Sequence, residues 1–330
     1  MASTAIRFAS GLYDRFLPLY TREVTPDGVD LDFNAIDDPR EIFDRMAAGL
    51  EFDACEMSGT EYITRLASGD CPFVAIPVFA SRMFRHGFIV VNKRSGIRAP
   101  RDLEGRRIGV QLYTMSAAMW IRGMLQHDHE VDLSNVRWVQ GAMDKPGAHG
   151  SPTVLPLLKQ PNLENNETGG SLSDLLEAGE IDAVIGATLP PALGRNPDIA
   201  RLFPDFRSAE ADYYQRTKIF PIMHLIVIRK DVHDAHPEVA SALYDAFCKS
   251  KEIALRRMRF SGALRYMLPF LPDDIDEIDR VFGGDPWPYG VEPNRPTLEA
   301  ELQYMVEQDY IAKSMPVADL FVPGIGATAG

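Results

Sequence analysis

Apolar residues recur with two different periods along the first part of the chain. Short runs rich in Val, Ile and Phe predict strands, whereas apolar residues three or four positions apart predict helices. The predicted strands cover residues 6–10, 30–36, 53–57, 73–79 and 88–92, and the predicted helices cover 39–49 and 61–68. This alternation of strand and helix indicates an α/β fold.

The same alternation continues in the later part of the chain. The pattern predicts strands at 107–110, 181–186 and 223–228, and helices at 116–126, 237–259 and 297–313. Residues 147–170 are rich in Pro, Asn and Gly and show no sustained period. We expect a loop there, with a short strand around Val154.

The chain is long enough for two lobes. Its 330 residues exceed one ordinary compact domain, and each lobe would bury its own core. Residues 96–105 contain two glycines and a proline and are expected to connect the lobes. We predict that residues 1–106 and 221–330 form the first lobe, that 107–220 form the second, and that a small anionic molecule binds in a cleft between them.

The charge balance narrows the classes of partner. A formal charge of −13 argues against a surface for nucleic acid or anionic membrane, because the field of the whole molecule repels phosphates. The chain starts without a basic, then apolar, export signal and has no segment of membrane-spanning length, which predicts a cytoplasmic protein. Three widely separated cysteines fit reduced core thiols: Cys55, Cys71 and Cys248.

Two arginines accompany a histidine just before a predicted strand. Arg82 and Arg85 suit carboxylates, because a guanidinium can form two parallel hydrogen bonds with one, although either arginine could simply pair with a surface acid. His86, which directly follows Arg85, and His224 are candidates for proton transfer, since imidazole changes protonation near neutral pH. The alternative for His224 is an ordinary hydrogen-bonded core histidine.

Further candidates lie at the ends of predicted strands. Arg15 follows the first strand, where Tyr13 and Asp14 could meet a ligand hydroxyl, and the alternative is a solvated turn. Alternation places Glu56 and Ser58 on one side of their strand. In the second lobe, polar residues between a strand and a helix could dock a carboxylate or serve only as turn and cap residues: Gln111, Tyr113, Thr114 and Ser116.

Other site types find less support. His127, Asp128 and His129 are adjacent, so their side chains should point in different directions, and we expect no metal site there. Neither a glycine-rich phosphate loop nor a nucleophile elbow occurs in the sequence.

The order of elements resembles a type II periplasmic-binding-protein fold, and four stretches narrow the resemblance. They are Arg-Met-Phe-Arg-His-Gly at 82–87, Met-Trp-Ile-Arg-Gly at 119–123, Phe-Pro-Ile-Met-His at 220–224 and Asp-Pro-Trp-Pro-Tyr-Gly at 285–290. Together they resemble the 4,5-dihydroxyphthalate decarboxylase family over nearly the whole chain.

This resemblance implies decarboxylation of 4,5-dihydroxyphthalate to protocatechuate, or of a close analogue, without a cofactor or metal. The reaction requires a proton donor at the ring carbon, a cationic hold on the retained carboxylate and an acceptor for a phenolic proton. We assign catalysis to His86, His224 and Glu56, although Glu56 could instead anchor Arg82 or Arg85. Substrate binding is assigned to Arg15, Arg82, Arg85, Ser58, Tyr113 and Thr114.

Two rival functions stay open at this point. One is a solute-binding protein for an aromatic acid or sulfonate that performs no chemistry. The other is a different enzyme of this architecture, similar to those of menaquinone or thiamin-pyrimidine synthesis. We also expect a homo-oligomer, with exposed apolar residues near Trp287, Tyr289 and the C-terminal helix at the subunit contact.

Overall fold

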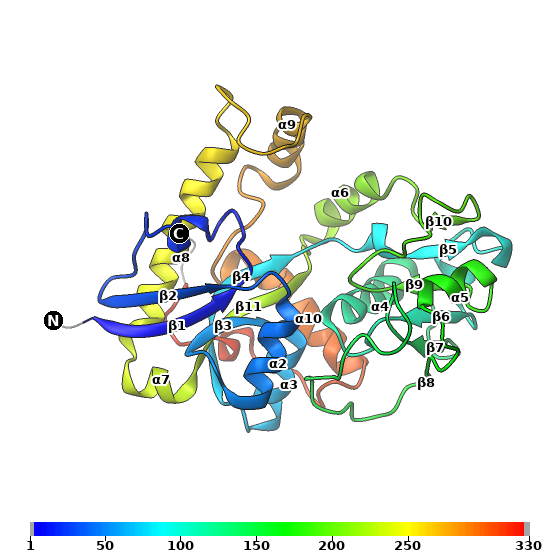
Figure 1. The fold of residues 1–330 in the computed structure, drawn as a ribbon, viewed down its shortest axis with the longest axis horizontal. Helices are drawn as coiled ribbons and strands as arrows, with labels where there is room; N and C mark the ends of the chain where they lie inside the picture. The colour runs from blue at the N-terminus through cyan, green and yellow to red at the C-terminus, as the bar shows by residue number, and fades with distance from the viewer. Residues whose placement is uncertain (1–2, 327–330) are drawn as a thin grey trace. The chain divides into compact units, whose positions relative to one another are not determined.

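The computed structural model describes residues 3–326, which form two compact units. Unit 1 contains the chain up to Arg82, Ile222–Glu299 and the residues from Met315 onward, whereas unit 2 contains Met83–Pro221 and Ala300–Ser314. Each unit has its own β-sheet with associated helices (Figure 1). The predicted α/β fold class is confirmed.

Unit 1 is built on a five-stranded sheet. Its strands are β1 (Thr4–Ser10), β2 (Val29–Ala35), β3 (Ala54–Ser58), β4 (Phe73–Arg82) and β11 (Ile222–Arg229). They lie in the order β2-β1-β3-β11-β4, with β1 parallel to β2 and β3 and with β11 antiparallel to β3 and β4 (Figure 1). A late segment of the chain therefore fills the space between two early strands.

The helices of unit 1 are α1 (Leu17–Tyr20), α2 (Pro39–Gly49), α3 (Gly59–Ser68), α7 (Lys230–Ala235), α8 (Glu238–Met258) and α9 (Leu271–Phe282), with 3-10 turns η4 (Glu292–Asn294) and η5 (Val317–Leu320). α2 starts at its predicted residue because the Asp38 side chain accepts from the N–H of Arg40 and Pro39 fits the first helical position. Phe247 of α8 packs against Phe8 of β1, with ring centroids 5.5 Å apart, so α8 covers this sheet.

Unit 2 is built on a six-stranded sheet. Its strands are β5 (Val90–Asn92), β6 (Arg107–Val110), β7 (Arg137–Gln140), β8 (Leu163–Asn165), β9 (Ala183–Ile185) and β10 (Ile199–Arg201), in the order β10-β5-β9-β6-β7-β8. Strands β6 to β9 pair in parallel, and β5 pairs antiparallel with β9 and β10.

The helices of unit 2 are α4 (Ser116–His129), α5 (Leu172–Ala178) and α6 (Phe206–Thr217), with 3-10 turns η1 (His86–Phe88), η2 (Lys93–Ser95) and η3 (Pro100–Leu103). α10 (Arg295–Glu307) begins among unit 1 residues and ends among unit 2 residues. Ser171 and Asp174 form a capping box that starts α5. Leu175 and Leu176 of this helix then join Val90, Val139 and Val184 in the buried core.

The chain leaves unit 1 earlier than the composition predicted. The first crossing follows Arg82, because residues 83–106 include β5, whose partners β9 and β10 belong to unit 2. The Gly and Pro residues of 96–105, read as a connection, lie in turns around η3 inside unit 2. The second crossing lies within one residue of its predicted place, and the segment Ala300–Ser314 adds a return to unit 2 that was not predicted.

Several shorter elements also differ from prediction. Val154 lies in a bend, and the strand of that region is β8. The C-terminal helix α10 ends at Glu307 rather than near Lys313. The elements that the pattern did not reveal are α1, β7, β8, α5, β10, α6, α7 and α9.

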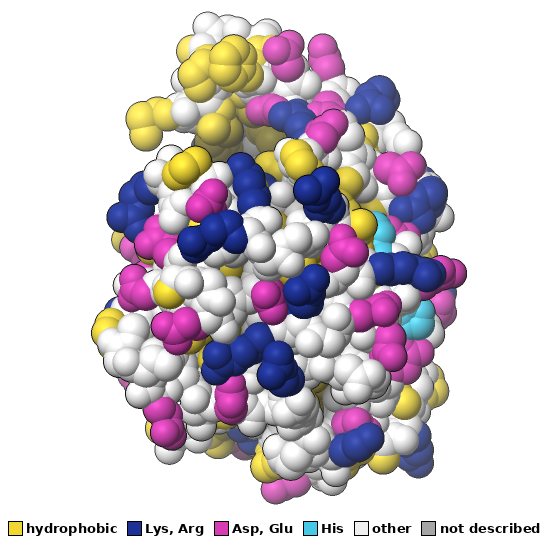
Figure 2. All heavy atoms as spheres, turned by 90° about the vertical axis from the view of Figure 1, so that its right-hand side faces the viewer, with side chains coloured by type: hydrophobic (Ala, Val, Ile, Leu, Met, Phe, Trp, Pro, Cys, Tyr) yellow, Lys and Arg dark blue, Asp and Glu magenta, His cyan; other side chains and the backbone are white. Residues whose placement is uncertain are grey.

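The surface corrects one further expectation. Tyr289 is only 6% exposed and does not supply the exposed contact that we expected, whereas Trp287 is partly buried and its Nε1–H donates to the carbonyl of Phe79. Exposed apolar side chains gather instead in the segment between α8 and α9: Phe260, Leu264, Met267, Leu268 and Phe270. On the face drawn in Figure 2, Lys and Arg side chains are interspersed with Asp and Glu.

Cys55 is buried as predicted, whereas Cys71 and Cys248 are partly exposed. Among the described residues, no helix combines the length and apolar character needed to cross a membrane.

Candidate functional site

One edge of the unit 1 sheet collects most of the polar residues singled out from the sequence. β1 ends at Ser10, β3 ends at Ser58 and β4 ends at Arg82. β11 starts at this edge, with Ile222 opposite Arg82 and His224 opposite Ser58. Open α/β sheets bind ligands outside the carboxyl ends of their strands, so this edge is a candidate site.

Glu56 lies at the centre of a hydrogen-bonded group that we call the Glu56 cluster: Ser10, Tyr13, Glu56 and His224. Its carboxylate is fully buried and accepts from the Ser10 hydroxyl at 2.7 Å, the Tyr13 hydroxyl at 2.7 Å and the Gly11 N–H at 3.1 Å. Burial alone would raise the pKa of Glu56, but hydrogen bonds from His224, Tyr13 and Ser10 outweigh it and leave the pKa below its usual value. The cluster therefore holds a buried, ionised carboxylate.

His224 contributes the imidazole of the cluster, and this ring is partly exposed. Its Nδ1 lies 2.6 Å from Glu56 Oε1, and its side chain is 19% exposed. An ionised carboxylate only accepts, so Nδ1 must carry the proton and Nε2 is left for another partner. Phe43 packs edge-on against the ring, with centroids 5.1 Å apart, and fixes its orientation.

Arg15 places a positive charge beside the same cluster. Its guanidinium carbon lies 4.3 Å from the ring centre of Tyr13 and 4.1 Å from that of Trp287, so two aromatic rings hold it. Nη2 donates to the carbonyl of Ala80, and Nη1 lies 3.3 Å from Asp14 Oδ1. Nε is buried and has no hydrogen-bond partner among residues 3–326, which leaves Arg15 with unused donor capacity.

Ser58 and Arg82 also lie at this edge but are engaged by neighbours. The Ser58 and Thr60 hydroxyls are 3.0 Å apart, and Arg82 Nη1 donates to Asn294 Oδ1 at 2.6 Å. The Glu56 carboxylate is occupied by the donors of its own cluster, so the alternative that Glu56 anchors Arg82 is wrong.

Arg85 belongs to unit 2 and is a buried cation. It is 7% exposed, and Nη1 donates to the carbonyl of Ala187 at 3.3 Å. Within the described chain no carboxylate lies within ion-pair distance of its guanidinium, and Nε has no hydrogen-bond partner. Burial lowers the pKa of Arg85 to about 10, against the opposing charge of Glu210. Such a site favours an anionic partner.

His86 lies in η1 and not at the start of a strand as predicted. Its ring is 2% exposed and packs against Phe203 and Tyr213, with centroids 5.3 Å and 5.2 Å away. Burial, and then the nearby His129, lower the pKa of His86 to about 4. The ring is therefore neutral at pH 7, which makes it a poor proton donor in this state.

Tyr113 and Thr114 line a cavity of about 380 Å³ in unit 2, together with Gln140 and Leu163. Tyr113 also lies under the guanidinium of Arg122, at 3.8 Å from the ring centre. Gln111 is engaged structurally, because its Oε1 accepts from the N–H groups of Ala187 and Thr188.

Sequence reasoning named Glu56 and His224 separately and missed that they pair. It also missed Ser10 as a donor and Trp287 as a wall for Arg15. The alternation that put Glu56 and Ser58 on one face was the usable signal, but the β11 register that brings His224 to that face could not be read from the pattern.

We expect Glu56→Gln to lower the free energy of unfolding by about 2 kcal/mol at pH 7, because hydrogen bonds to a charged group are lost. A carboxyl whose pKa is lowered on folding stabilises above its unfolded pKa, and this contribution disappears as the pH falls through the folded pKa. Urea unfolding at pH 7, 5 and 3.5 should therefore show a difference from wild type that shrinks toward acid. The exposed Glu252→Gln is the control, and a difference that stayed constant with pH would contradict an ionised Glu56.

Comparisons with known proteins agree with this architecture. No family model matches the chain. The chain is 37% identical over 324 residues to a 4,5-dihydroxyphthalate decarboxylase from Comamonas testosteroni, covering 98% of both chains. A second protein of that name, from Pseudomonas putida, is 38% identical over 211 residues, which cover 64% of this chain and 81% of the relative.

Solved structures of sulfonate-binding proteins share the fold. The periplasmic aliphatic sulphonate binding protein SsuA from Escherichia coli has a TM-score of 0.53 at 11% identity, covering 97% of both chains. The alkanesulfonate-binding protein SsuA from Xanthomonas axonopodis has a TM-score of 0.50 at 10% identity, covering 98% of this chain and 99% of its own. These confirm the periplasmic-binding-protein-like fold and, with the full-length relative at 37% identity, show that the chain belongs to the 4,5-dihydroxyphthalate decarboxylase family.

Proposed function

We propose that this protein is a carboxy-lyase that releases one carboxylate of 4,5-dihydroxyphthalate as carbon dioxide and forms protocatechuate. The observation that carries the proposal is His224, held by an ionised, buried carboxylate at the carboxyl edge of the sheet. The name of the full-length relative supplies the substrate.

The chemistry requires one proton per turnover. Each carboxylate of the substrate has a ring hydroxyl para to it, and that oxygen can donate electron density toward the carbon that bears the carboxylate. A proton adds to this carbon, the bond to the carboxylate breaks, and its electron pair restores the aromatic ring. The products are carbon dioxide and the ring with hydrogen in place of the carboxylate, so the proton must be replaced from solvent.

His224 is proposed as the proton donor, acting through Nε2 in its doubly protonated form. Glu56 is fully buried, so in this proposal it acts as a positioning residue: it orients the imidazole and balances the positive charge. The imidazole of His224 is thus held in a fixed orientation from which its Nε2 proton can be transferred to the substrate, as general acid catalysis requires. Direct acceptance of a phenolic proton by Glu56, our first expectation, would need the cluster to open.

Arg15 is proposed to bind the retained carboxylate. The aromatic walls hold its guanidinium plane, and the unused Nε donor suits one carboxylate oxygen. Roles for Ser58, Arg82, Arg85, Tyr113 and Thr114 in substrate binding stay predictions, as do catalysis by His86, a cytoplasmic location and a homo-oligomer.

The test is to measure carbon dioxide and protocatechuate from purified protein with 4,5-dihydroxyphthalate. Equal amounts of the two products, with uptake of one proton, are expected. Phthalate is the matched control substrate, because it lacks the hydroxyls that push electrons toward the reacting carbon. Tight binding of 4,5-dihydroxyphthalate without products would refute the proposal and favour a solute-binding protein.

A further inference from the structure

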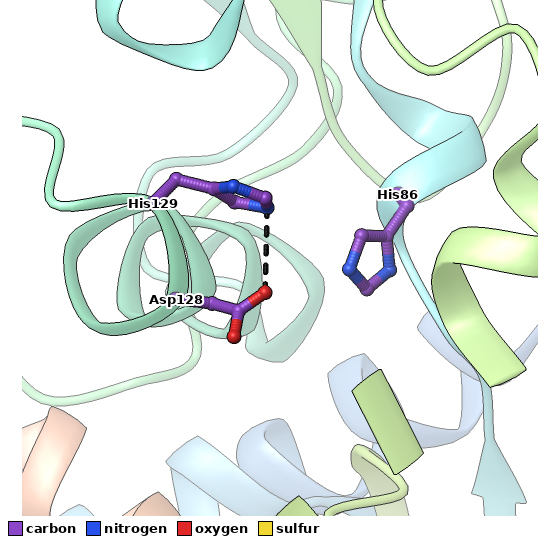
Figure 3. A group of neighbouring side chains, drawn as sticks. All are labelled: His86, Asp128 and His129. Carbon is purple, nitrogen blue, oxygen red and sulfur yellow. Dashed lines mark ion pairs between the residues drawn. The ribbon is translucent and has the colours of Figure 1, made fainter. Parts of the chain in front are cut away.

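Three side chains outside the Glu56 cluster converge within unit 2. His86 comes from η1, and Asp128 and His129 come from the last turn of α4. One ligand atom from each lies within 4.8 Å of the others. Figure 3 shows the ring of His86 facing the side chains of Asp128 and His129, with His129 and Asp128 side by side.

One ring nitrogen of each histidine is buried without a hydrogen bond among residues 3–326. His86 is 2% exposed, and its Nδ1 makes no hydrogen bond within the described part of the chain. The same holds for the buried Nε2 of His129, which lies 3.5 Å from Asp128 Oδ2. Buried polar atoms are normally satisfied, and His129 Nε2, which faces Asp128, is the unsatisfied atom that points to a ligand between these side chains.

The protonation states fit a cation. Burial, and then the nearby His129, lower the pKa of His86 against the charge of Asp128, and burial also lowers the pKa of His129, so both rings can serve as neutral donors. Burial would raise the pKa of Asp128, but Arg216 outweighs it and keeps the pKa low. Two neutral imidazoles and one carboxylate are a donor set used by zinc.

We infer that His86, Asp128 and His129 form a binding site for a divalent transition metal, for which Zn²⁺ is the best match. Three protein ligands would leave a fourth position open to water or another ligand. The decarboxylation proposed above needs no metal at this place, so the two proposals stand or fall separately.

The geometry requires a small closure. Ligand atoms around a tetrahedral Zn²⁺ are roughly 3.3 Å apart for Zn–N bonds of about 2.0 Å. Their present separations lie within 4.8 Å, and His129 Nε2 and Asp128 Oδ2 are already 3.5 Å apart, so a small inward movement of the side chains suffices. His129 is the last residue of α4, where side-chain rotation leaves the helix intact.

Two charged neighbours modulate this site. Arg216 donates to both oxygens of Asp128, at 2.8 Å and 3.1 Å, and competes with a metal for them. A carboxylate that binds Zn²⁺ through one oxygen can keep Arg216 on the other. Glu210 Oε1 lies 3.9 Å from His86 Nδ1, beyond hydrogen-bond distance, and would have to approach this nitrogen to orient the ring when its Nε2 binds a metal.

The ion pair with Arg216 would by itself explain why Asp128 is ionised and where its carboxylate lies. It does not account for the convergence of His86 and His129 on Asp128, because within the described residues neither ring forms a hydrogen bond with that carboxylate. His127, the neighbour on α4, turns to Glu307 and lies outside the group, but Asp128 and His129 lie together, so the expectation that adjacent side chains diverge is wrong for this pair.

The test is calorimetric titration of chelator-treated protein with Zn²⁺ at pH 7.5, with Co²⁺ absorption as a second readout of coordination. We expect one Zn²⁺ per chain and a tetrahedral Co²⁺ spectrum. His129→Ala and Asp128→Asn should each weaken binding by on the order of 100-fold. His127→Ala, from the same helix turn, should bind as wild type does.

Absence of Zn²⁺ binding to the wild-type protein would overturn the inference, and so would binding that His129→Ala leaves unchanged. Both outcomes are readable even if a variant at the more buried His86 does not fold. Arg216→Gln should tighten Zn²⁺ binding several-fold, because it removes the competing cation. Weaker binding in that variant would rule out Asp128 as a ligand.

Discussion

His224→Asn should lower kcat for 4,5-dihydroxyphthalate by about 10²- to 10⁴-fold, the range that a positioned proton donor contributes. The asparagine amide can still donate to Glu56 from the place of Nδ1, so the cluster should remain folded. It has no group that can deliver a proton from the place of Nε2. Steady-state rates of protocatechuate formation measure the change, and circular dichroism checks the fold.

His236→Asn is the matched control, because His236 also lies in unit 1 and its side chain is 48% exposed. Its kcat should equal that of wild type. Substrate binding to His224→Asn, followed by calorimetry, should change little, since the donor acts after binding. If kcat fell no further in His224→Asn than in the control, another group would have to supply the proton.

Arg15→Met is expected to raise KM for 4,5-dihydroxyphthalate on the order of 100-fold, because a charge-assisted pair of hydrogen bonds to the retained carboxylate is lost. Methionine keeps much of the apolar contact with Tyr13 and Trp287. Arg15→Lys keeps the charge without the planar fork, so its KM should fall between those of wild type and Arg15→Met. The readout is KM and kcat from initial rates.

Arg256→Met provides the comparison, since Arg256 is exposed on α8 in the same unit. This variant should leave KM unchanged. A loss in kcat alone for Arg15→Met would show that Arg15 acts on the reacting groups rather than on the retained carboxylate. An unchanged KM and kcat would remove Arg15 from the site.

Helices and strands whose sequence signal lies within one short segment could be predicted from the sequence. The apolar run Met-His-Leu-Ile-Val-Ile at 223–228 predicts a strand, and β11 is there. Asp38 and Pro39 mark the start of α2 to the residue. Such signals depend on neighbours in the chain, which the pattern contains.

Features that depend on contacts between segments far apart in the chain could not be predicted from the sequence. Glu56 and His224 are 168 residues apart, and only the insertion of β11 beside β3 brings them together. The same limit explains the misplaced crossing: glycine and proline in 96–105 signal turns, but only the pairing of β5 shows which sheet those turns serve. His86 was noticed for its neighbours in sequence, whereas its spatial neighbours come from α4.

The insertion of β11 between β3 and β4 also dictates an order of events during synthesis. β3 and β4 leave the ribosome long before β11, and until it arrives each presents an unpaired edge in what will be the middle of a sheet. Most of unit 2 is synthesised in that interval, so it can begin to fold while unit 1 waits. A nascent chain that stops before Ile222 would keep the unpaired edges of β3 and β4 permanently. We therefore expect such a chain to bind chaperones or aggregate rather than to be partly active.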